Sequence, residues 1–491
     1  MVRALEDSGC FDLTVAPVRA PRHSSRVGLL ERTYRTLDRL AFGSATGPDS
    51  GANVVVDDRT LDSIVQERTP TAILDLTSTL KDGLRWRGIP LLHLSFHGLP
   101  ARRLIDAVRL PLGHRNGTTG VTGMVVGDST RRALFVGRCF VDHRSLARSV
   151  QLVVRKIPMV VLASMRRLDA QGEPESIEAP PAHPGALGAA VLLLRLARSV
   201  ARQLLFRDQW IIDLHRDPAH AGAGERRIRL RPDANAFWAD PFLVQDETAV
   251  HVFLEELTFA DRKGRILLIS VDRNGRAADP VVVLEQPWHL SYPQVITWQD
   301  RLVMIPESSA NRSVDLYECV GFPREWTFAS TLISGMRLAD ATVIHWNGRW
   351  WMFAAHGHEG ASMYDELHVF WANDLPGPWH PHALNPVKID AGSSRPAGAM
   401  FIEHGQLVRP TQDCRTRYGG GIAFQQVVVL DEDHFLETPI ERPREPDIPN
   451  SAATHTYNSI DGFIATDVLE SVARYRSALD RFLPARRRNR Y

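Results

Sequence analysis

Five polar residues recur in the second half of the chain, each at the mouth of a short β-type segment. They are Asp240, Tyr292, Asp340, Arg395 and His455, separated by 52, 48, 55 and 60 residues. Paired carboxyl groups such as Asp240 and Asp340 can act as base and acid in glycoside chemistry. An arginine at the fourth position cannot donate a proton near neutral pH, but it binds carboxylate or phosphate groups. The set therefore indicates a sugar site.

The elements that must position these residues repeat with the same period. Each interval of about fifty residues holds about four strand-like runs, which is typical of a β-propeller. The innermost strands of a propeller converge on one axis, so the five residues are expected to meet in a central funnel. The fifth repeat is short, and we expect the upstream run QWIIDLH at 209–215 to supply its missing strand.

Further candidates surround this expected funnel. Glu256 and Glu307 each end a second strand and are candidate acids, although alternation lets only one of Glu255 and Glu256 point inward. Catalytic roles are thus predicted for Asp240, Asp340, Glu307 and Glu256. Substrate contacts are predicted for His289, Tyr292, Arg395, Arg409, Gln412, Asp413 and His455. Alternatives remain open: Asp240 can serve a structural Asp-Pro turn, and Arg409 or Asp413 can belong to a buried ion pair.

The first part of the chain has a different pattern. Strand-like and helix-like runs alternate, which favours an α/β domain with a mainly parallel sheet. A proline-rich segment and an amphipathic helix follow, and that helix either docks on a neighbouring domain or contacts a membrane surface. The predicted divisions are an α/β domain at 1–167, linker and helix at 168–208, a propeller at 209–465, and a C-terminal helix with a basic tail at 466–491.

The composition is that of a globular protein with 44% hydrophobic residues and a net charge of +1, which gives no reason to expect a nucleic-acid partner. The four cysteines form no CxxC pair, and the N-terminus does not read as a secretory signal. We expect a cytoplasmic protein that meets the inner face of the membrane if its substrate is lipid-linked. No cofactor is expected and no fixed metal-ligand spacing is present, although a divalent ion on the propeller axis is an open alternative.

Several motifs resemble one family. The strings WADPFLV, MIPESSANRSVDLYEC, DATVIHWNGRWWMFA, SSRPAGAMF, LVRPTQDC and HTYN are similar to the five-bladed propeller domain at the N-terminus of plant glucosamine inositolphosphorylceramide transferase. The resemblance covers roughly 237–465 and implies the architecture of the arabinanase, xylosidase and fructosidase glycosidases. It also implies that Asp240 is a general base, that Asp340 tunes the acid, and that a glutamate acid belongs near Arg395.

The first domain resembles a degenerate formyltransferase, as in bacterial relatives that carry this domain before the propeller. TTGVTGMVVGD at 118–128 is similar to a strand of that fold, and His93 and Ser95 fall in its Asn-x-His-x-Ser motif. Leu91 replaces the asparagine, so the amide that would polarise a formyl carbonyl is missing.

Three functions follow from these observations. The first is an enzyme that transfers or hydrolyses a glycosyl group on an anionic or phosphate-linked sugar in glycan or glycolipid metabolism. The second is a non-catalytic sugar-binding scaffold. The third is an amino-sugar formyltransferase. The sequence leans toward the enzyme and leaves the oligomeric state open.

Overall fold

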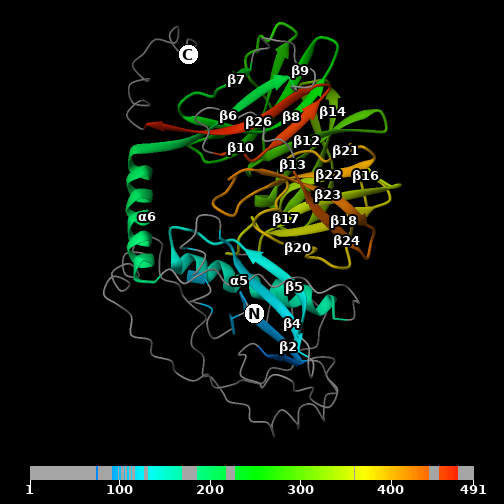
Figure 1. The fold of residues 1–491 in the computed structure, drawn as a ribbon. Coiled ribbons are helices and arrows are strands. Elements are labelled where there is room, and N and C mark those ends of the chain that lie inside the picture. The colour runs from blue at the N-terminus through cyan, green and yellow to red at the C-terminus, as the bar shows by residue number, and fades with distance from the viewer. Residues whose placement is uncertain are drawn as a thin grey trace. The chain divides into compact units, whose positions relative to one another are not determined.

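The computed structural model separates the chain into two compact units. Unit 1 comprises Met1–Arg198, His358–Asp365 and Lys388–Ala391, and unit 2 comprises Ser199–Gly357, Glu366–Val387 and Gly392–Tyr491. Figure 1 shows the elements of both. The residues that the structure describes are 73–75, 91–97, 99–100, 104, 108–109, 112, 117–126, 131–168, 185–216, 227–358, 360–441 and 453–473.

Unit 1 contains a sheet with strand order β1-β2-β4-β5, and β3 pairs with β2. The strands are β1 Ile73–Asp75, β2 Leu91–Phe96, β3 Leu99–Pro100, β4 Thr119–Val126 and β5 Arg131–Cys139. Only β1 and β2 pair in parallel among these described strands, and the other pairs are antiparallel. The prediction of a mainly parallel sheet is therefore wrong for this part. The part of the predicted α/β domain that precedes Ile73 lies outside the described residues.

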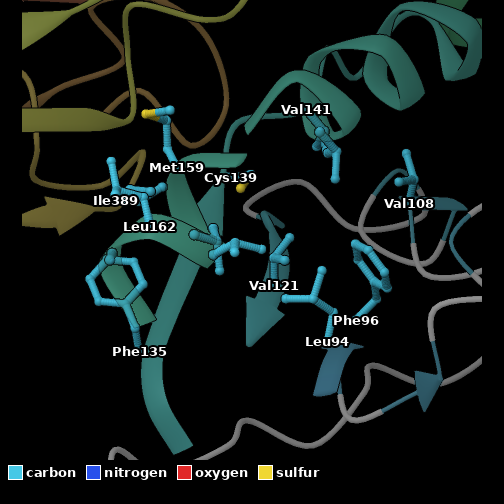
Figure 2. Packing of buried hydrophobic residues seen from close by; sticks show 14 of the residues in the cluster. Leu94, Phe96, Val108, Val121, Phe135, Cys139, Val141, Met159, Leu162 and Ile389 are labelled. Carbon is cyan, nitrogen blue, oxygen red and sulfur yellow. The ribbon is translucent and has the colours of Figure 1, made fainter. Parts of the chain in front are cut away.

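Helix α5, Leu146–Arg166, covers this sheet and confirms the helical spacing of the sequence. It begins where Ser145 accepts a hydrogen bond from the Arg148 amide at 3.0 Å, which satisfies one of the free N–H groups of the first turn. Its apolar face joins the core of unit 1 (Figure 2). Gly123 on β4 permits close packing, because a Cβ there would lie 1.9 Å from Ser164 Oγ. The core residues include Leu94, Phe96, Val121, Phe135, Val153, Val160 and Val161.

Unit 1 also buries a charged pair. Lys156 of α5 lies 3.1 Å from Asp365, and their side chains are 0% and 1% exposed. Asp365 also accepts a hydrogen bond from the Phe140 amide at 2.8 Å. Each charge depends on its partner, because an isolated ion is costly in a low-dielectric interior.

We expect Lys156→Met to lower the free energy of unfolding by about 3–5 kcal/mol, because Asp365 then loses its buried counter-ion. Chemical denaturation followed by circular dichroism measures this effect. Arg148→Met is the control, since Arg148 lies on the same helix with 49% side-chain exposure and should cost less than about 1 kcal/mol. The double variant Lys156→Met/Asp365→Leu should recover much of the loss. Equal losses for the single variant and the control would contradict the prediction.

Helix α6, Gly185–Leu205, follows the proline-rich segment and matches the predicted amphipathic helix. Leu196 is buried in the core of unit 1, whereas Leu194, Leu204 and Leu205 are 71%, 70% and 61% exposed. Within the described residues no helix has the length and apolar character needed to span a bilayer.

Unit 2 is built from five sheets of mainly antiparallel strands in its described part. Four follow chain order, namely β8-β9-β10-β11, β12-β13-β14-β15, β16-β17-β18-β19 and β21-β22-β23-β24. The bounds are β8 Ala236–Gln245, β9 Ala249–Thr258, β10 Gly264–Asp272, β11 Val281–Leu284, β12 Ser291–Trp298, β13 Arg301–Ser308, β14 Ser313–Gly321, β15 Glu325–Ser334, β16 Leu338–Trp346, β17 Arg349–His356, β18 Glu366–Ala372, β19 His380–Pro381, β21 Phe401–Glu403, β22 Gln406–Gln412, β23 Ile422–Leu430 and β24 Phe435–Ile440. The short strand β20, Lys388–Ile389, belongs to unit 1.

The fifth sheet joins both ends of the unit in the order β25-β26-β6-β7. Its strands are β25 Tyr457–Ile460, β26 Phe463–Ala473, β6 Phe206–Arg216 and β7 Ile228–Leu230. Strand β6 contains QWIIDLH and pairs with β26, as the sequence predicted. Because β26 runs to Ala473, the C-terminal helix predicted for ESVARYRSALDRFL is wrong over 470–473, where the backbone pairs with β6 instead; the rest of that segment lies outside the described residues.

Two-residue hairpins connect the first and second strands of several of these sheets. Asn347-Gly348 joins β16 to β17 with φ of 49° and 77°, and His404-Gly405 joins β21 to β22 with φ of 50° and 75°. Positive φ at both central residues matches the twist of a β-hairpin. These turns fix the pairing register of the first and second strands that they connect.

Candidate active site

A repeated β-bulge positions the first three predicted residues. Asp240, Tyr292 and Asp340 have φ of 52°, 46° and 53°, and the pairing of the first and second strands shifts register at each of them. Left-handed backbone is uncommon for residues other than glycine, so its recurrence at three equivalent places is a property of the fold. Ahead of β21 the positive-φ residue is Gly398, three residues after Arg395. By this criterion Gly398, and not Arg395, is the fourth counterpart of Asp240.

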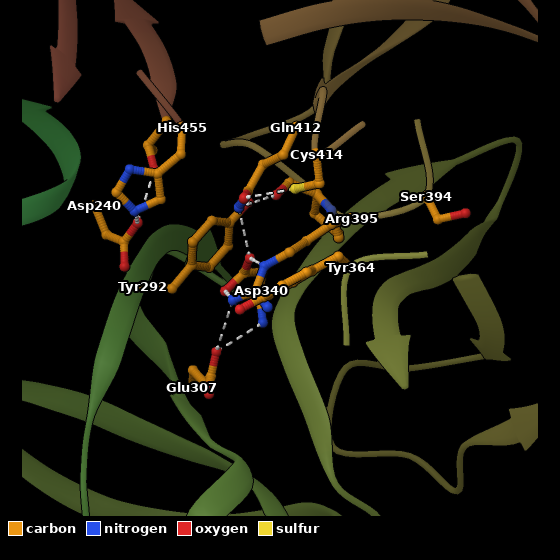
Figure 3. Close-up of polar contacts among 12 residues, drawn as sticks. Asp240, Tyr292, Glu307, Asp340, Tyr364, Ser394, Arg395, Gln412, Cys414 and His455 are labelled. Carbon is orange, nitrogen blue, oxygen red and sulfur yellow. Dashed lines mark hydrogen bonds and ion pairs between the residues drawn. The ribbon is translucent and has the colours of Figure 1, made fainter. Parts of the chain in front are cut away.

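Arg395 nevertheless joins Asp340. Its Nε and Nη2 lie 2.6 and 3.1 Å from the two carboxylate oxygens of Asp340, and Gln412 Nε2 donates to the same carboxylate at 2.9 Å. Glu307 lies next to this pair, with Oε2 3.2 Å from the Asp340 amide nitrogen and 3.9 Å from Arg395 Nη2. Figure 3 shows these side chains pointing toward one another. Four predicted residues from three sheets therefore meet.

Asp240 joins a second group through His455. Imidazole Nε2 lies 3.2 Å from Asp240 Oδ1, and Nδ1 lies 2.9 Å from Asp467 Oδ2 (Figure 3 shows the Asp240 side). Thr456 Oγ1 donates to Asp240 at 2.7 Å, while the backbone amides of Asp240, His455 and Thr456 all donate to Asp467. Asp467 is fully buried on β26 and was missed by the sequence analysis. In the sequence Asp467 is a single aspartate within ATDVLE, and no motif there points to a functional role.

This second group has the residue types of a metal site. Asp240, His455 and Asp467 offer ligand atoms within 4.8 Å of one another. However, His455 directs one ring nitrogen at each carboxylate, and one ion can be bound through only one of those nitrogens. The geometry therefore fits a carboxylate–imidazole–carboxylate relay better than an ion on the axis.

Glu255, and not Glu256, takes part in this site. Alternation along β9 turns the two side chains to opposite faces. Glu256 is held by Trp238 Nε1 at 3.1 Å and by Arg265 Nη2 at 2.6 Å. Glu255 is 5% exposed, and its Oε1 lies 3.3 Å from His289 Nε2. The choice of Glu256 is thus corrected by the bulge register, in which Ala239 pairs with Glu255 as Ser291 pairs with Glu307.

The tautomer of His289 follows from its other contact. The Gly264 amide donates to His289 Nδ1 at 2.9 Å, so in the neutral ring the proton sits on Nε2 and faces Glu255. His289 is 31% exposed in its side chain, whereas Glu255 is buried. The histidine was predicted as a substrate contact, and the structure places it between Glu255 and solvent.

The electrostatic environment separates the carboxyl groups. Burial alone would raise the pKa of Asp240, but the charge of His455 and the hydrogen bonds from His455 and Thr456 outweigh burial and lower it. Burial, reinforced by the charge of Asp240, raises the pKa of Glu255 well above its ordinary value. Burial also raises the pKa of Asp340, against the charge of Arg395 and with the help of Glu307. The environment thus favours the ionised form of Asp240 and the protonated form of Glu255, which is the pairing that acid–base chemistry needs.

Three predicted contacts have structural partners instead. Arg409 is fully buried and pairs with Glu437 at 2.7 and 3.0 Å, while it donates to the Ser393 and Ser394 carbonyls. Asp413 forms a surface ion pair with Arg415 at 2.6 Å. The hydroxyl of Tyr292 accepts from the Gly398 amide at 2.6 Å and bonds to Thr342 at 2.8 Å. Arg409 is thus the buried ion-pair alternative, Asp413 belongs to a surface pair, and Tyr292 links β12 to β16 and to the segment before β21.

Aromatic side chains complete the site. Tyr418 lies under the Arg395 guanidinium at 5.0 Å from ring centroid to Cζ, and its centroid is 5.0 Å from that of His455. Trp210 of β6 contacts His455 from another side at 4.3 Å between centroids. Tyr418 therefore connects the Asp340 group to the Asp240 group. We call Asp240, Glu255, Glu307, Asp340, Arg395, Gln412, His455 and Asp467 the central cluster.

The candidate formyl-transfer residues lie on β2 of unit 1. His93 and Ser95 are 5% and 3% exposed, and they pair across the ladder with Met124 and Thr122 of β4. Leu91 begins the strand at the position where the motif has asparagine. The predicted strand context is present, while formyl transfer itself stays a prediction.

Residues 229–458 match the family described as "Glucosamine inositolphosphorylceramide transferase 1, N-terminal". The chain is 32% identical over 208 residues to glucosamine inositolphosphorylceramide transferase 1 of Oryza sativa subsp. japonica, covering 42% of this chain and 28% of that protein. It is 29% identical over 208 residues to the Arabidopsis thaliana protein of that name, covering 42% and 27%. The matches support the family predicted for this region, and they span less than a third of the relatives' length.

Two solved structures give weaker likenesses. One is Zg3597, a family 117 glycoside hydrolase from Zobellia galactanivorans, at 12% identity and a TM-score of 0.35, covering 55% of this chain and 91% of that one. The other is the α-L-arabinofuranosidase PaAbf62A from Podospora anserina, at 10% identity and a TM-score of 0.36, covering 54% and 98%. Likeness at this level does not extend to chemistry.

The relay around His455 predicts a pH dependence of stability. Although burial opposes its charge, Asp467 and Asp240 raise the pKa of His455 to about 10. A raised pKa in the folded state gives stability that is fully present below the unfolded pKa of about 6.5 and lost as pH rises through 10. The free energy of unfolding should fall over this window, with a slope that approaches about 1.4 kcal/mol per pH unit for one proton.

Denaturant titrations between about pH 6 and 10 test this expectation. His455→Gln should be less stable at pH 6 and should show a flatter dependence on pH. His345→Gln is the control, because His345 is exposed on β16. A wild-type slope that His455→Gln leaves unchanged would show that this histidine does not carry the proton.

Proposed function

We propose that unit 2 is a five-bladed propeller that carries a carbohydrate-active enzyme site, which transfers or hydrolyses a glycosyl group. The observation that carries the proposal is the pair Asp240 and Glu255, whose environments shift their pKa values in opposite directions. Glycosyl chemistry needs one carboxylate as base or nucleophile and one protonated carboxyl group as acid. The glycosyltransferase name of the curated relatives supports the same class.

In this proposal Asp240 is the base or nucleophile. His455 and Thr456 hold its carboxylate in the ionised form, and Asp467 holds His455. Glu255 is the acid, and His289 relays protons between it and solvent. Asp340 was predicted as a catalytic carboxylate. Its contacts with Arg395 and Gln412 suit it instead to holding those two side chains in position.

The class of sugar depends on how the arginines near the site are paired. The preference for an anionic or phosphate-linked sugar rested on Arg395 and Arg409, and Arg409 is committed to Glu437. The Arg395 guanidinium is engaged by the Asp340 carboxyl group at 2.6 Å. An anionic group would therefore have to share Arg395 with that carboxylate. Cytoplasmic location, contact with the inner face of a membrane and a formyltransferase-like unit 1 remain proposals from the sequence.

A non-catalytic sugar-binding scaffold is the second candidate. The observation that favours it is that Arg395 donates to both carboxyl oxygens of Asp340. Asp340, a predicted catalytic residue, is therefore already engaged within the protein. Under this alternative the aromatic ring of Tyr418 and the polar groups of the central cluster bind a sugar without turnover.

Asp240→Asn and Glu255→Gln should each reduce turnover at least about 100-fold, because each removes one half of the acid–base pair. Turnover is measured against nitrophenyl glycosides of neutral sugars and uronic acids, sugar phosphates and nucleotide sugars. Glu256→Gln is the matched control, since its carboxylate is held by Arg265 on the opposite face of β9, and it should change turnover only a few-fold.

The same panel separates the two functions. If the wild type binds sugars and turns over none of them, the scaffold replaces the enzyme. If Glu256→Gln loses as much activity as Glu255→Gln, the assignment of the acid is wrong. Retained sugar binding in Asp240→Asn, measured by calorimetry, distinguishes lost chemistry from lost folding.

Arg395 offers a separate test of the anionic sugar. The double variant Arg395→Gln/Asp340→Asn changes both members of the pair together, so that neither buried group is left facing a lost partner. If Arg395 contacts an anionic group, the affinity for uronic acids or sugar phosphates should fall about 10-fold or more, while that for neutral sugars stays within a few-fold. Equal changes for both classes would leave a neutral sugar as the substrate.

A further inference from the structure

A second group of ionisable side chains lies in the third sheet of unit 2, outside the central cluster. His356 ends β17, while Glu366 begins β18 and His368 follows two residues later. Glu366 is fully buried, and the side chains of His356 and His368 are only 12% and 11% exposed. The sequence analysis found no signal for this group, because ten residues separate the first two members.

The strand register places these three side chains on one face. Ala355 pairs with Leu367 and Ala354 pairs with His368, so continuing the antiparallel ladder sets His356 opposite Glu366. Glu366 and His368 are two residues apart on one strand and therefore project to the same side. The positions are held by paired backbone and not by a loop, which gives a rigid donor set.

The donor atoms converge on one carboxylate oxygen. Glu366 Oε1 lies 3.2 Å from His356 Nδ1 and 2.9 Å from His368 Nε2, and the two imidazole centroids are 4.7 Å apart. Ligands about 2.0–2.1 Å from a tetrahedral Zn²⁺ are separated by roughly 3.3 Å. The two nitrogen–oxygen distances are close to that value. Small side-chain movements would let one ion replace the protons between these atoms.

The donor types also suit a transition metal. Two imidazoles and one carboxylate form the protein ligand set of several catalytic zinc sites, which keep the fourth position for water. A divalent ion at this place would be bound by the two imidazoles in their neutral form together with the Glu366 carboxylate. The number of imidazoles distinguishes this group from Asp240, His455 and Asp467, where one imidazole is shared by two carboxylates.

We propose that His356 Nδ1, Glu366 and His368 Nε2 form a binding site for one divalent transition-metal ion of the Zn²⁺ type. The site lies at the end of β17, where His356 pairs with Leu338, two residues before Asp340. It is independent of the proposed glycosyl chemistry, which uses other residues. The ion fixes the ends of β17 and β18 beside the bulge that carries Asp340.

The test is titration of the purified full-length protein, stripped with a chelator, with Zn²⁺ by calorimetry and with Co²⁺ by visible absorption. One Zn²⁺ should bind per chain, and Co²⁺ should give the absorption bands of tetrahedral coordination. Glu366→Gln and His368→Ala should each weaken binding at least about 100-fold. His345→Ala, which removes an exposed histidine from β16 of the same sheet, should leave the affinity unchanged.

Folding is checked separately, since Glu366 is buried. Glu366→Gln keeps the size and hydrogen-bonding capacity of the side chain, and its thermal unfolding without metal reports whether the fold persists. Zn²⁺ should raise the midpoint of unfolding of the wild type and of His345→Ala, but not that of a folded Glu366→Gln variant. Absence of stoichiometric binding in the wild type, or equal binding by all variants, would overturn the proposal.

Discussion

The balance of charge in a dry interior governs the centre of unit 2. Five carboxyl groups of the central cluster are at most 8% exposed, while its cations are Arg395 and protonated His455. If every carboxyl group were ionised, the cluster would carry three uncompensated negative charges, which a low-dielectric interior strongly disfavours. Some of them must therefore hold protons. The five buried carboxyl groups among which these protons are distributed are Asp240, Glu255, Glu307, Asp340 and Asp467.

The positions of hydrogen-bond donors decide where those protons reside. Asp240 and Asp467 receive backbone amides, a hydroxyl and the imidazole of His455, so both are supplied with donors. Glu255 is buried, faces His289 and feels the charge of Asp240, so its pKa is raised and the protonated form is favoured. Asp340 and Glu307 share one guanidinium. The carboxyl groups of the site thus differ in pKa because all are buried but they receive different numbers of hydrogen bonds.

The arrangement of the repeat could be predicted from the sequence, but not the face that each neighbouring residue presents. Polar residues at fifty-residue intervals predicted that Asp240, Asp340 and His455 come from equivalent places. The choice between Glu255 and Glu256 depended on a bulge that shifts register after Ala239, and alternation alone does not reveal such a shift. Arg409 looked like a ligand contact because its partner Glu437 lies on a strand 28 residues away.

Arg395 shows how one residue type can support two interpretations. Its sequence context suggested that an arginine replaces a catalytic acid, because it was aligned with Asp240. The backbone places Gly398 at that position, and a Cβ there would lie 1.9 Å from the Tyr457 carbonyl oxygen, so the chain can only present a glycine. The acid must then come from another strand, and Glu255 is at a second-strand position equivalent to that of Glu307. With Arg395 engaged by Asp340, the arginine organises the carboxyl groups of the site, and anion recognition is a secondary role that it would have to share with them.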